Sequence, residues 1–516
     1  MRLSWLLIPL LFMNELHGAA MDPAEMRHLL SRTGFGVAEP EAVGALKGLT
    51  HDQAVEHLLA GIRQEPVTAP PDWVREPLAD RRQMRMETAG LSEEERKKRF
   101  MERQRLNRRR GAELKAWWYG EMLATDSPLT ERMVLVWHNH FTSSLQKVRA
   151  PQLMHRQNAL LRRNALGNFG ALLHAVARDP AMLVYLDNVT NRRTAPNENF
   201  ARELLELFTL GEGHYTERDI KEAARAFTGW QVDRQAASFR INPRQHDSDA
   251  KVFMSRRGSL EGNDIIEIVL EQPRTAVYIT EKLWLEFISD QPDPVEVERL
   301  AGIFRENDYE LKPLMRAMLT SEHFRRSENR GGLIKSPTEL LVGTARLFDV
   351  PVENPYSFVV FGRRLGQDLL NPPNVKGWPG GTHWINSNSL LVRREFIERL
   401  VAGEGPDRRA VEMWRMMRDE AQAEMAMDGG GDSPSSGKSR NPRRKLNPQR
   451  MERIAMHMAP QADLDAWLAG LPENTTDPKI LQWLLLALPP TEAASPMQPF
   501  DQRVAALLLD PVYQLK

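Results

Sequence analysis

The chain has 516 residues, of which 41% are hydrophobic, and its 69 basic residues are balanced by 69 acidic ones. A chain of this length and composition can bury a sizeable core, and zero net charge gives no reason to expect a nucleic-acid partner. It contains no cysteine, which excludes disulfides, cysteine-ligated zinc, iron–sulfur clusters, thiol nucleophiles and an N-terminal lipid-bearing cysteine.

The first twenty residues have the features of a secretory signal peptide. Arg2 supplies a positive charge, residues 3–13 form an apolar run, and Gly18 and Ala20 are the small residues of a cleavage site. We therefore expect cleavage near Ala20 and a periplasmic or secreted mature chain. The alternative is an uncleaved N-terminal anchor, because short apolar runs are ambiguous. No later segment is long and apolar enough to cross a bilayer, so we expect no membrane span in the mature chain.

Helix caps recur along the rest of the chain. Ser92, Thr216 and Ser336 each precede a carboxylate by three residues, which is the spacing that satisfies free backbone donors at a helix start. Pro337 stands at a first helical position, where its missing N–H costs nothing. No convincing run of alternating strand residues occurs. The sequence therefore predicts an all-α protein, with a multi-helical, bundle-like core, long turn-rich loops and little or no β-sheet.

Composition divides the chain into segments. After the signal peptide (1–20), we expect a helical core over 21–403, a charged helix and flexible linker over 404–448, and a small helical appendage over 449–516. A basic helical insertion is expected within the core at about 92–112, because nine of the fifteen residues from 96 to 110 are basic. Such a helix could grip an anionic polymer or a membrane surface, but a simply solvated helix is the favoured interpretation.

Two histidines end one apolar helical run, in the segment Trp-His-Asn-His-Phe at 137–141. Residues two apart on a helix point in nearly opposite directions, so they can meet at one ion only if the helix ends there. A divalent metal is a candidate cofactor, although metal sites need further donors. The alternative is a pair of histidines hydrogen-bonded within a polar core. The candidate metal ligands are His138, His140, His214, His246 and Asp247.

A second polar cluster occupies residues 197–208. On a helix, Asn199, Glu203 and Glu206 share one face, and Glu198, Arg202 and Glu206 are spaced as a ladder of opposite charges. Carboxylates at this spacing suit an acid–base pair, so Glu203 and Glu206, oriented by Arg202, are the candidate catalytic residues. The favoured alternative is an ion-pair network that only holds the helix in place.

A third cluster is the turn-rich loop at 371–381, which contains two asparagines, two adjacent prolines and Trp378. Together with Trp384 and Asn386, this loop could form an aromatic platform with amide donors, which suits the apolar face and polar rim of a sugar ring. The alternative is a loop that packs its tryptophans against the helices. The candidate ligand-binding residues are Asn197, Asn199, Trp230, Asn371, Asn374 and Trp378.

Several motifs in one order carry a resemblance to a bacterial family. They lie at residues 28–36, 137–141, 179–183, 197–203, 213–216, 226–230, 246–247, 371–375 and 377–378. Over about 28–393 the chain resembles the domain of unknown function 1800 proteins. This resemblance implies a large exported bacterial protein with no established activity, whose relatives are commonly encoded beside a sulfatase-like exported family. A sulfatase-like exported protein is therefore one candidate partner.

Two functions follow from these observations. The first is a hydrolase-like enzyme that acts on an envelope or extracellular polymer. The second is a non-catalytic scaffold of the cell envelope that binds a polysaccharide or a protein. The concentration of carboxylates, amides and imidazoles between His138 and Trp378 motivates the first, and whether the protein is an enzyme stays open at this point.

Overall fold

The computed structural model describes residues 19–36, 44–78, 85–86, 88–352, 354–401, 460–470, 478–492, 495 and 497–516. Residues 1–18 of the expected signal peptide and the whole expected linker at 404–448 lie outside these ranges. The described part is predominantly helical, with two small two-stranded sheets. The prediction of an all-α fold with little β-sheet is confirmed. Among the described residues, no helix is both long and apolar enough to span a membrane.

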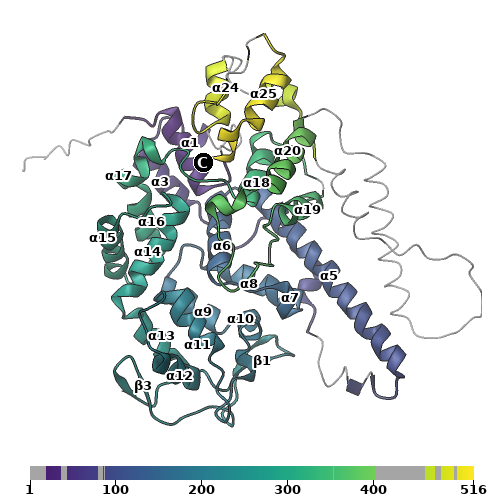
Figure 1. The fold of residues 1–516 in the computed structure, drawn as a ribbon, viewed down its shortest axis with the longest axis vertical. Helices are drawn as coiled ribbons and strands as arrows, with labels where there is room; N and C mark the ends of the chain where they lie inside the picture. The colour runs from purple at the N-terminus through teal and green to yellow at the C-terminus, as the bar shows by residue number, and fades with distance from the viewer. Residues whose placement is uncertain are drawn as a thin grey trace, which may run out of the picture.

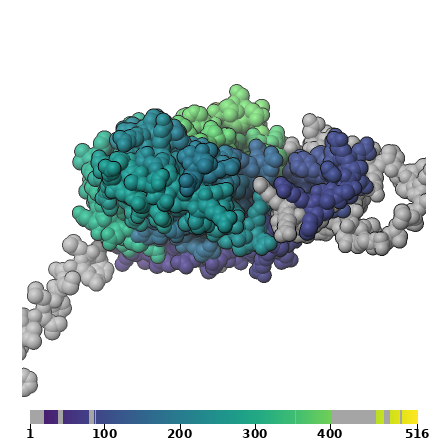
Figure 2. Space-filling model, turned by 90° about the horizontal axis from the view of Figure 1, so that it is seen from below, coloured from purple at the N-terminus to yellow at the C-terminus, as the bar shows by residue number. Residues whose placement is uncertain are grey.

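The N-terminal third contains the longest described helix. The elements in order are α1 (Pro23–Thr33), α3 (His51–Ala60), the 3-10 turn η1 (Asp72–Arg75), α5 (Glu93–Ala124) and α6 (Pro128–His140). Helix α5 is about 48 Å long at the usual rise per residue. It begins at the Ser92 capping box, as expected. Its first turns, through Arg103, are exposed and project from the body of the molecule (Figures 1 and 2).

The middle of the chain consists of short helices. These are α7 (Leu145–Val148), α8 (Pro151–Arg163), α9 (Phe169–Ala177), α10 (Pro180–Tyr185), η2 (Asn188–Thr190), α11 (Asn199–Glu203), η3 (Leu204–Thr209) and α12 (Glu217–Ala226). Segment η3 is a π-helix that continues directly from α11. The backbone N–H of Leu210 donates to the carbonyl of Leu205 at 2.9 Å, five residues back. Such π-turns are rare and frequently lie at functional sites.

Four short strands follow α12 at the end of the molecule opposite α24 and α25 (Figure 1). Strand β1 (Trp230–Asp233) pairs antiparallel with β2 (Ser238–Ile241), and β3 (Lys251–Phe253) pairs antiparallel with β4 (Arg256–Gly258). In the first sheet Trp230 lies opposite Ile241. Strands of three or four residues are too short to show an alternating pattern in sequence, which is why none was predicted.

The remaining elements close the core. They are α13 (Gly262–Leu270), α14 (Pro273–Phe287), α15 (Pro294–Glu306), α16 (Leu311–Leu319), α17 (Glu322–Arg325), η4 (Ser327–Asn329), α18 (Pro337–Leu347), α19 (Tyr356–Arg364), η5 (Gly381–Trp384), α20 (Ser387–Val401), α23 (Leu464–Ala469), α24 (Pro478–Leu485), α25 (Phe500–Leu509) and η6 (Pro511–Gln514). Helices α24 and α25 pack on α1 and α20. Their buried residues join the same hydrophobic core as the rest of the chain.

Helix α6 lies near the centre of the molecule (Figure 1) and is buried from Leu129 to His138. It carries a buried ion pair to α8, in which Arg162 binds both carboxylate oxygens of Glu131 at 2.6 and 2.9 Å. Trp118 of α5 donates its indole N–H to the same carboxylate at 2.9 Å. Because breaking a buried pair leaves an uncompensated charge, this network holds three helices in one arrangement. The C-terminal end of α6, at Asn139 and His140, is thereby placed at a cavity.

Candidate functional site

A large cavity lies at the C-terminal end of α6. Its volume is about 670 Å³, and its walls come from α6, η3, α14, the loop at 375–384 and the last residue, Lys516. We call it the central pocket. Of the residues singled out in the sequence, His140, Glu206 and Trp378 line it, as does Trp384. Three segments that are far apart in the chain therefore meet here.

Asn139 fixes the loop that forms one wall of the central pocket. Its side-chain oxygen accepts the backbone N–H of Trp378 at 2.7 Å, and its amide nitrogen donates to the carbonyl of Trp378 at 3.3 Å. Gly377 has a φ of +81°, and a Cβ at that position would lie 2.2 Å from the Asn139 side-chain oxygen. Only glycine fits such a backbone and such a close approach. The clamp sets the position of the Trp378 ring.

The two histidines of α6 have different surroundings. His138 is buried with its ring edge-on to Trp118 at 5.5 Å between centroids and tilted against Trp378 at 5.8 Å. Burial lowers the pKa of His138 to about 4. His140 faces the central pocket, and its Nε2 lies 3.1 Å from the carbonyl of Phe208, so it is the donor there. Burial, followed by the charge of Lys282, lowers the pKa of His140 to about 3. Both rings are therefore neutral at pH 7.

The two glutamates of the second cluster lie close together but in unequal environments. Glu206, within the π-helix, accepts a hydrogen bond from the Tyr215 hydroxyl at 2.9 Å and lies 3.9 Å from the Lys376 ammonium. Glu203 is buried and does not line the central pocket. Burial and then the charge of Glu206 raise the pKa of Glu203. The pair therefore combines one carboxylate in the pocket wall with a neighbour that resists ionisation.

Arg202 binds neither of these glutamates. Its guanidinium donates to both oxygens of Glu217 at 2.8 and 3.0 Å and to Glu198 at 3.3 Å. These bonds tie α11 to the first turn of α12. The charge of Arg202 still lowers the pKa of Glu203, as a smaller effect than burial. Its observed bonds are those of a residue that fixes the helices, not of one that orients Glu206.

The predicted ligand-binding asparagines mostly satisfy local backbone. Asn197 accepts the backbone N–H of Asn199 at 3.0 Å, and Asn199 donates to the carbonyl of Leu186 at 3.2 Å. Asn371 accepts from the backbone of Gln146 at 3.2 Å, and Asn374 accepts from the backbone of Lys376 at 2.8 Å. None of these four lines the central pocket. Asn197 instead borders an open surface hollow with Thr190 and Arg192. Trp230 is 1% exposed and packs edge-on against Phe227 and Phe239.

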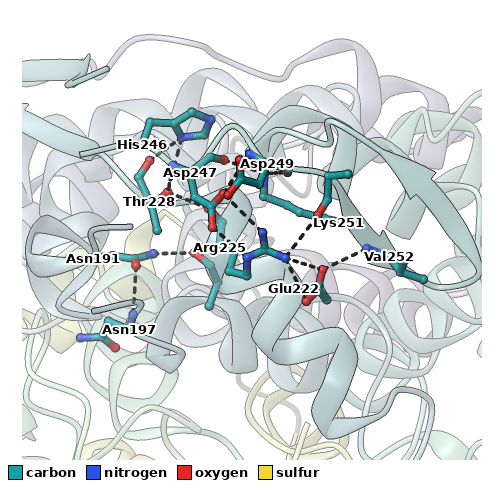
Figure 3. Close-up of polar contacts among 12 residues, drawn as sticks. Asn191, Asn197, Glu222, Arg225, Thr228, His246, Asp247, Asp249, Lys251 and Val252 are labelled. Carbon is teal, nitrogen blue, oxygen red and sulfur yellow. Dashed lines mark hydrogen bonds and ion pairs between the residues drawn. The ribbon is translucent and has the colours of Figure 1, made fainter. Parts of the chain in front are cut away.

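His246 and Asp247 belong to a separate polar network beside the strands (Figure 3). His246 donates from Nδ1 to the carbonyl of Thr228 at 2.8 Å, and the backbone N–H of Asp247 donates to the Thr228 hydroxyl at 2.7 Å. Arg225 binds the Asp247 carboxylate at 2.8 Å. Lys251 donates to the Asp247 carbonyl at 2.6 Å. The network joins α12 to the loop before β3.

The five candidate metal ligands do not come together. His138 and His140 face different neighbours, His214 is exposed, and His246 and Asp247 lie in the network of Figure 3. Within the part of the chain that the structure describes, no three histidine, cysteine, aspartate or glutamate side chains form a group that could hold a metal ion.

A family model described as "Protein of unknown function (DUF1800)" matches residues 28–515. The chain belongs to this family. The DUF1800 match runs well past residue 393, where the resemblance seen in the sequence ends, so it includes the C-terminal helices that pack on α1 and α20. No curated protein and no solved structure matches the chain. The function of this DUF1800 protein is therefore argued from its own residues.

One end of the central pocket was not anticipated from sequence. Arg132 of α6 lies 2.8 Å from Glu286 of α14 and 2.9 Å from Glu339 of α18, and the ammonium of Lys516 also binds Glu339. Burial alone would raise the pKa of Glu339, but Arg132 and Lys516 lower it to about 2. These residues come from four separate segments of the DUF1800 chain. The only local signal was the capping box that contains Glu339.

Proposed function

We propose that this DUF1800 protein is exported and binds a saccharide segment of an envelope or extracellular polymer in the central pocket. The observation that carries this proposal is the meeting of Tyr278, Trp378 and Trp384 with charged side chains around one cavity. The volume of about 670 Å³ is within the range of pockets that take small ligands.

A sugar ring has an apolar face and a rim of hydroxyl groups, so it binds where aromatic surface and polar groups alternate. Trp378 and Trp384 are only 5% and 7% exposed, so a bound ring would contact their edges inside the pocket. Lys376 at the mouth forms an ion pair with Glu212 at 3.1 Å. This pair and Glu206 would supply hydrogen-bond partners for the hydroxyl groups.

A hydrolase-like activity is the second candidate, favoured by the unequal glutamates of the π-helix. Burial raises the pKa of Glu203, which suits a general acid, while the Glu206 carboxylate, which lines the pocket, would act as base or nucleophile. Glu203 does not line the pocket, and for that reason binding is the better supported function.

The proposal is tested by titrating soluble oligosaccharides, both neutral hexose oligomers and uronic-acid oligomers, into the full chain by calorimetry. We expect Trp384→Ala to weaken binding about tenfold, as removal of a buried aromatic anchor does. Phe100→Ala is the matched control, because Phe100 is 55% exposed on α5, outside the pocket. Equal affinity for the wild type and Trp384→Ala would contradict the proposal.

Catalysis is separated from binding by Glu206→Gln, which keeps the shape of the side chain and removes its charge. A hydrolase would lose the release of new reducing ends from a bound oligosaccharide by about a hundredfold or more, while keeping most of its affinity. A binding protein would release none in either form.

Export and partnership are tested separately. N-terminal sequencing of the protein recovered from the periplasm or the medium should begin at or near Met21. For the alternative of a protein-binding scaffold, a sulfatase-like exported protein is the proposed partner, and it should co-purify with the chain from the same fraction.

A further inference from the structure

We infer that one end of the central pocket is a subsite for an anionic group, such as a uronic-acid carboxylate or an ester sulfate, held by Arg132 and Lys516. We call it the basic end. The inference deepens the proposed function, because it specifies that the saccharide is acidic, and it rests on that proposal only for the identity of the polymer.

Positive charge is in excess around the basic end. The cationic residues there are all at most 7% exposed; they are Arg27, Arg32, Arg132, Lys335, Arg393 and Lys516. Arg132 and Arg32 repel Lys516, and Arg27 and Arg393 repel Lys335. The buried carboxylate of Glu339 acts on five of these six cations, all but Arg27. The Glu286 side chain, which is 34% exposed, assists by binding Arg132. Buried charges are costly unless they are paired, so this excess favours an added anion.

Hydrogen-bond donors without an acceptor also remain at the basic end. One oxygen of Glu339 binds Arg132 and Lys516, and the other accepts the backbone N–H of Ser336 at 2.7 Å. The Nε of Arg132, and the Nε and one terminal nitrogen of Arg32, are buried without a hydrogen-bond partner in the described structure. Arg132 and Lys516 line the cavity, whereas Arg32 is not among the lining residues and acts on Lys516 through its charge. An anion would supply the acceptors that this end lacks.

Helix α18 also begins at this end, but the N–H groups of its first turn already have acceptors. Its 11 residues begin after Ser336, which itself lines the central pocket. Thr338 donates its backbone N–H to the side-chain oxygen of Gln367 at 2.8 Å, and Glu339 donates its backbone N–H to the Ser336 hydroxyl at 3.3 Å. The groups left to hold an anion here are therefore the side chains of Arg132 and Lys516, which line the cavity.

Lys516 is held in place by its own backbone. Its N–H donates to the carbonyl of Leu333 at 2.8 Å, and Leu515 forms a bridge with Ile334. Burial and then the charge of Arg132 lower the pKa of Lys516 to about 8, and Glu339 and Glu286 partly oppose this. An adjacent anion favours the charged ammonium. Binding near pH 8 should therefore be accompanied by proton uptake.

The charged groups around Lys516 come from every packed element. Arg32 lies on α1, Arg132 on α6, Glu286 on α14 and Glu339 on α18. The arginines stay protonated near pH 8, and the pKa of Glu339 is about 2. Burial lowers the pKa of Arg32 to about 9 and the pKa values of Arg27 and Arg393 to about 10. It also lowers the pKa of Lys335, whose ammonium lies 3.7 Å from the Tyr513 ring centroid, well below its ordinary value. Comparing variants at position 516 isolates the Lys516 contribution to proton uptake.

The test uses calorimetry on the full chain at pH 8, in two buffers with different ionisation enthalpies. The probes are inorganic sulfate, acetate, a galacturonic-acid trisaccharide, a sulfated trisaccharide and a neutral trisaccharide. We expect the acidic saccharides to bind at least about tenfold more tightly than the neutral one, because hydrogen bonds to charged groups are strong. The uronate and sulfate arms show which acidic group is preferred.

Lys516→Met should weaken anion binding about tenfold and remove most of the proton uptake. Lys516→Arg should retain the affinity but lose the uptake, since arginine is already charged, and it keeps the test valid if the methionine variant fails to fold. Lys312→Met is the control, because Lys312 is exposed on α16.

Three outcomes would overturn the inference: equal affinity for acidic and neutral saccharides, unchanged anion binding in Lys516→Met, or proton uptake in Lys516→Arg that is as large as in the wild type. In the first case the saccharide proposal would still stand. If sulfate binds and Lys516→Met weakens it while no saccharide binds, the anion subsite is supported and the saccharide proposal fails.

Discussion

The clamp between Asn139 and the Trp378 loop gives a sharp prediction. In Gly377→Ala, the new Cβ would lie 2.2 Å from the Asn139 side-chain oxygen and 2.6 Å from the Asn139 carbonyl oxygen. One of these is backbone on a buried helix, so the loop has to move. Movement breaks the two hydrogen bonds between Asn139 and Trp378.

The magnitude follows from two contributions. Placing alanine at a φ of +81° costs about 1–2 kcal/mol. Loss of the two hydrogen bonds adds about 1 kcal/mol each. We therefore expect Gly377→Ala to lower the free energy of unfolding by about 3–4 kcal/mol.

Gly213→Ala is the matched control. Gly213 has a φ of +84° and no atom within 4 Å of its would-be Cβ, so it carries the backbone strain without the clash. Urea denaturation followed by circular dichroism measures both variants. The Gly377 variant should be less stable than the control by about 2 kcal/mol, and it should also bind the pocket ligand more weakly. Equal losses in the two variants would refute the role of the clamp.

Three further predictions concern buried charge. Arg162→Met should lower the free energy of unfolding by about 3–5 kcal/mol, because it leaves Glu131 uncompensated; adding Glu131→Gln should recover part of this loss in urea denaturation, and an additive double variant would contradict the pairing. Burial raises the pKa of Asp179 to about 7 from an ordinary 3.8. Between these values the folded state holds a proton that the unfolded state has lost, so this group's contribution to stability falls as the pH rises to about 7 and is constant above it. Asp179→Asn should flatten that fall in urea midpoints measured from pH 4 to 8, and an unchanged slope would show that Asp179 is not its source. Burial also raises the pKa of Glu203, so the contribution of Glu203 to stability likewise falls as the pH rises above the ordinary glutamate pKa. Glu203→Gln should remove this loss of stability, whereas the exposed control Glu328→Gln should leave it unchanged.

Much of the helical fold could be predicted because helix starts are local events. The capping boxes at Ser92, Thr216 and Ser336 all begin helices in the structure. Their hydrogen bonds join residues three positions apart, so the sequence spacing is itself the geometry. The π-helix after Glu203 was not predicted, since it depends on how Leu204–Thr209 pack, and the short strands carry too few residues for a pattern.

The site could be predicted only in part. His140, Glu206 and Trp378 stood out because each lies in a dense polar or aromatic segment, and the central pocket contains all three. Trp230 and the asparagines stood out for the same reason, yet they pack in the core or support turns. A high local density of polar and aromatic residues shows that these side chains have a role, but it does not show whether they bind a ligand or support the backbone.

The sequence by itself determined that this protein is helical and where its long helices begin, because capping depends on neighbours along the chain. Its motifs also determined the family, which the match over residues 28–515 extends. Only the tertiary structure decided which charges share a low-dielectric space. Arg132, Glu286, Glu339 and Lys516 are ordinary residues in sequence, and their pKa values and pairing arise because four distant segments exclude water around them.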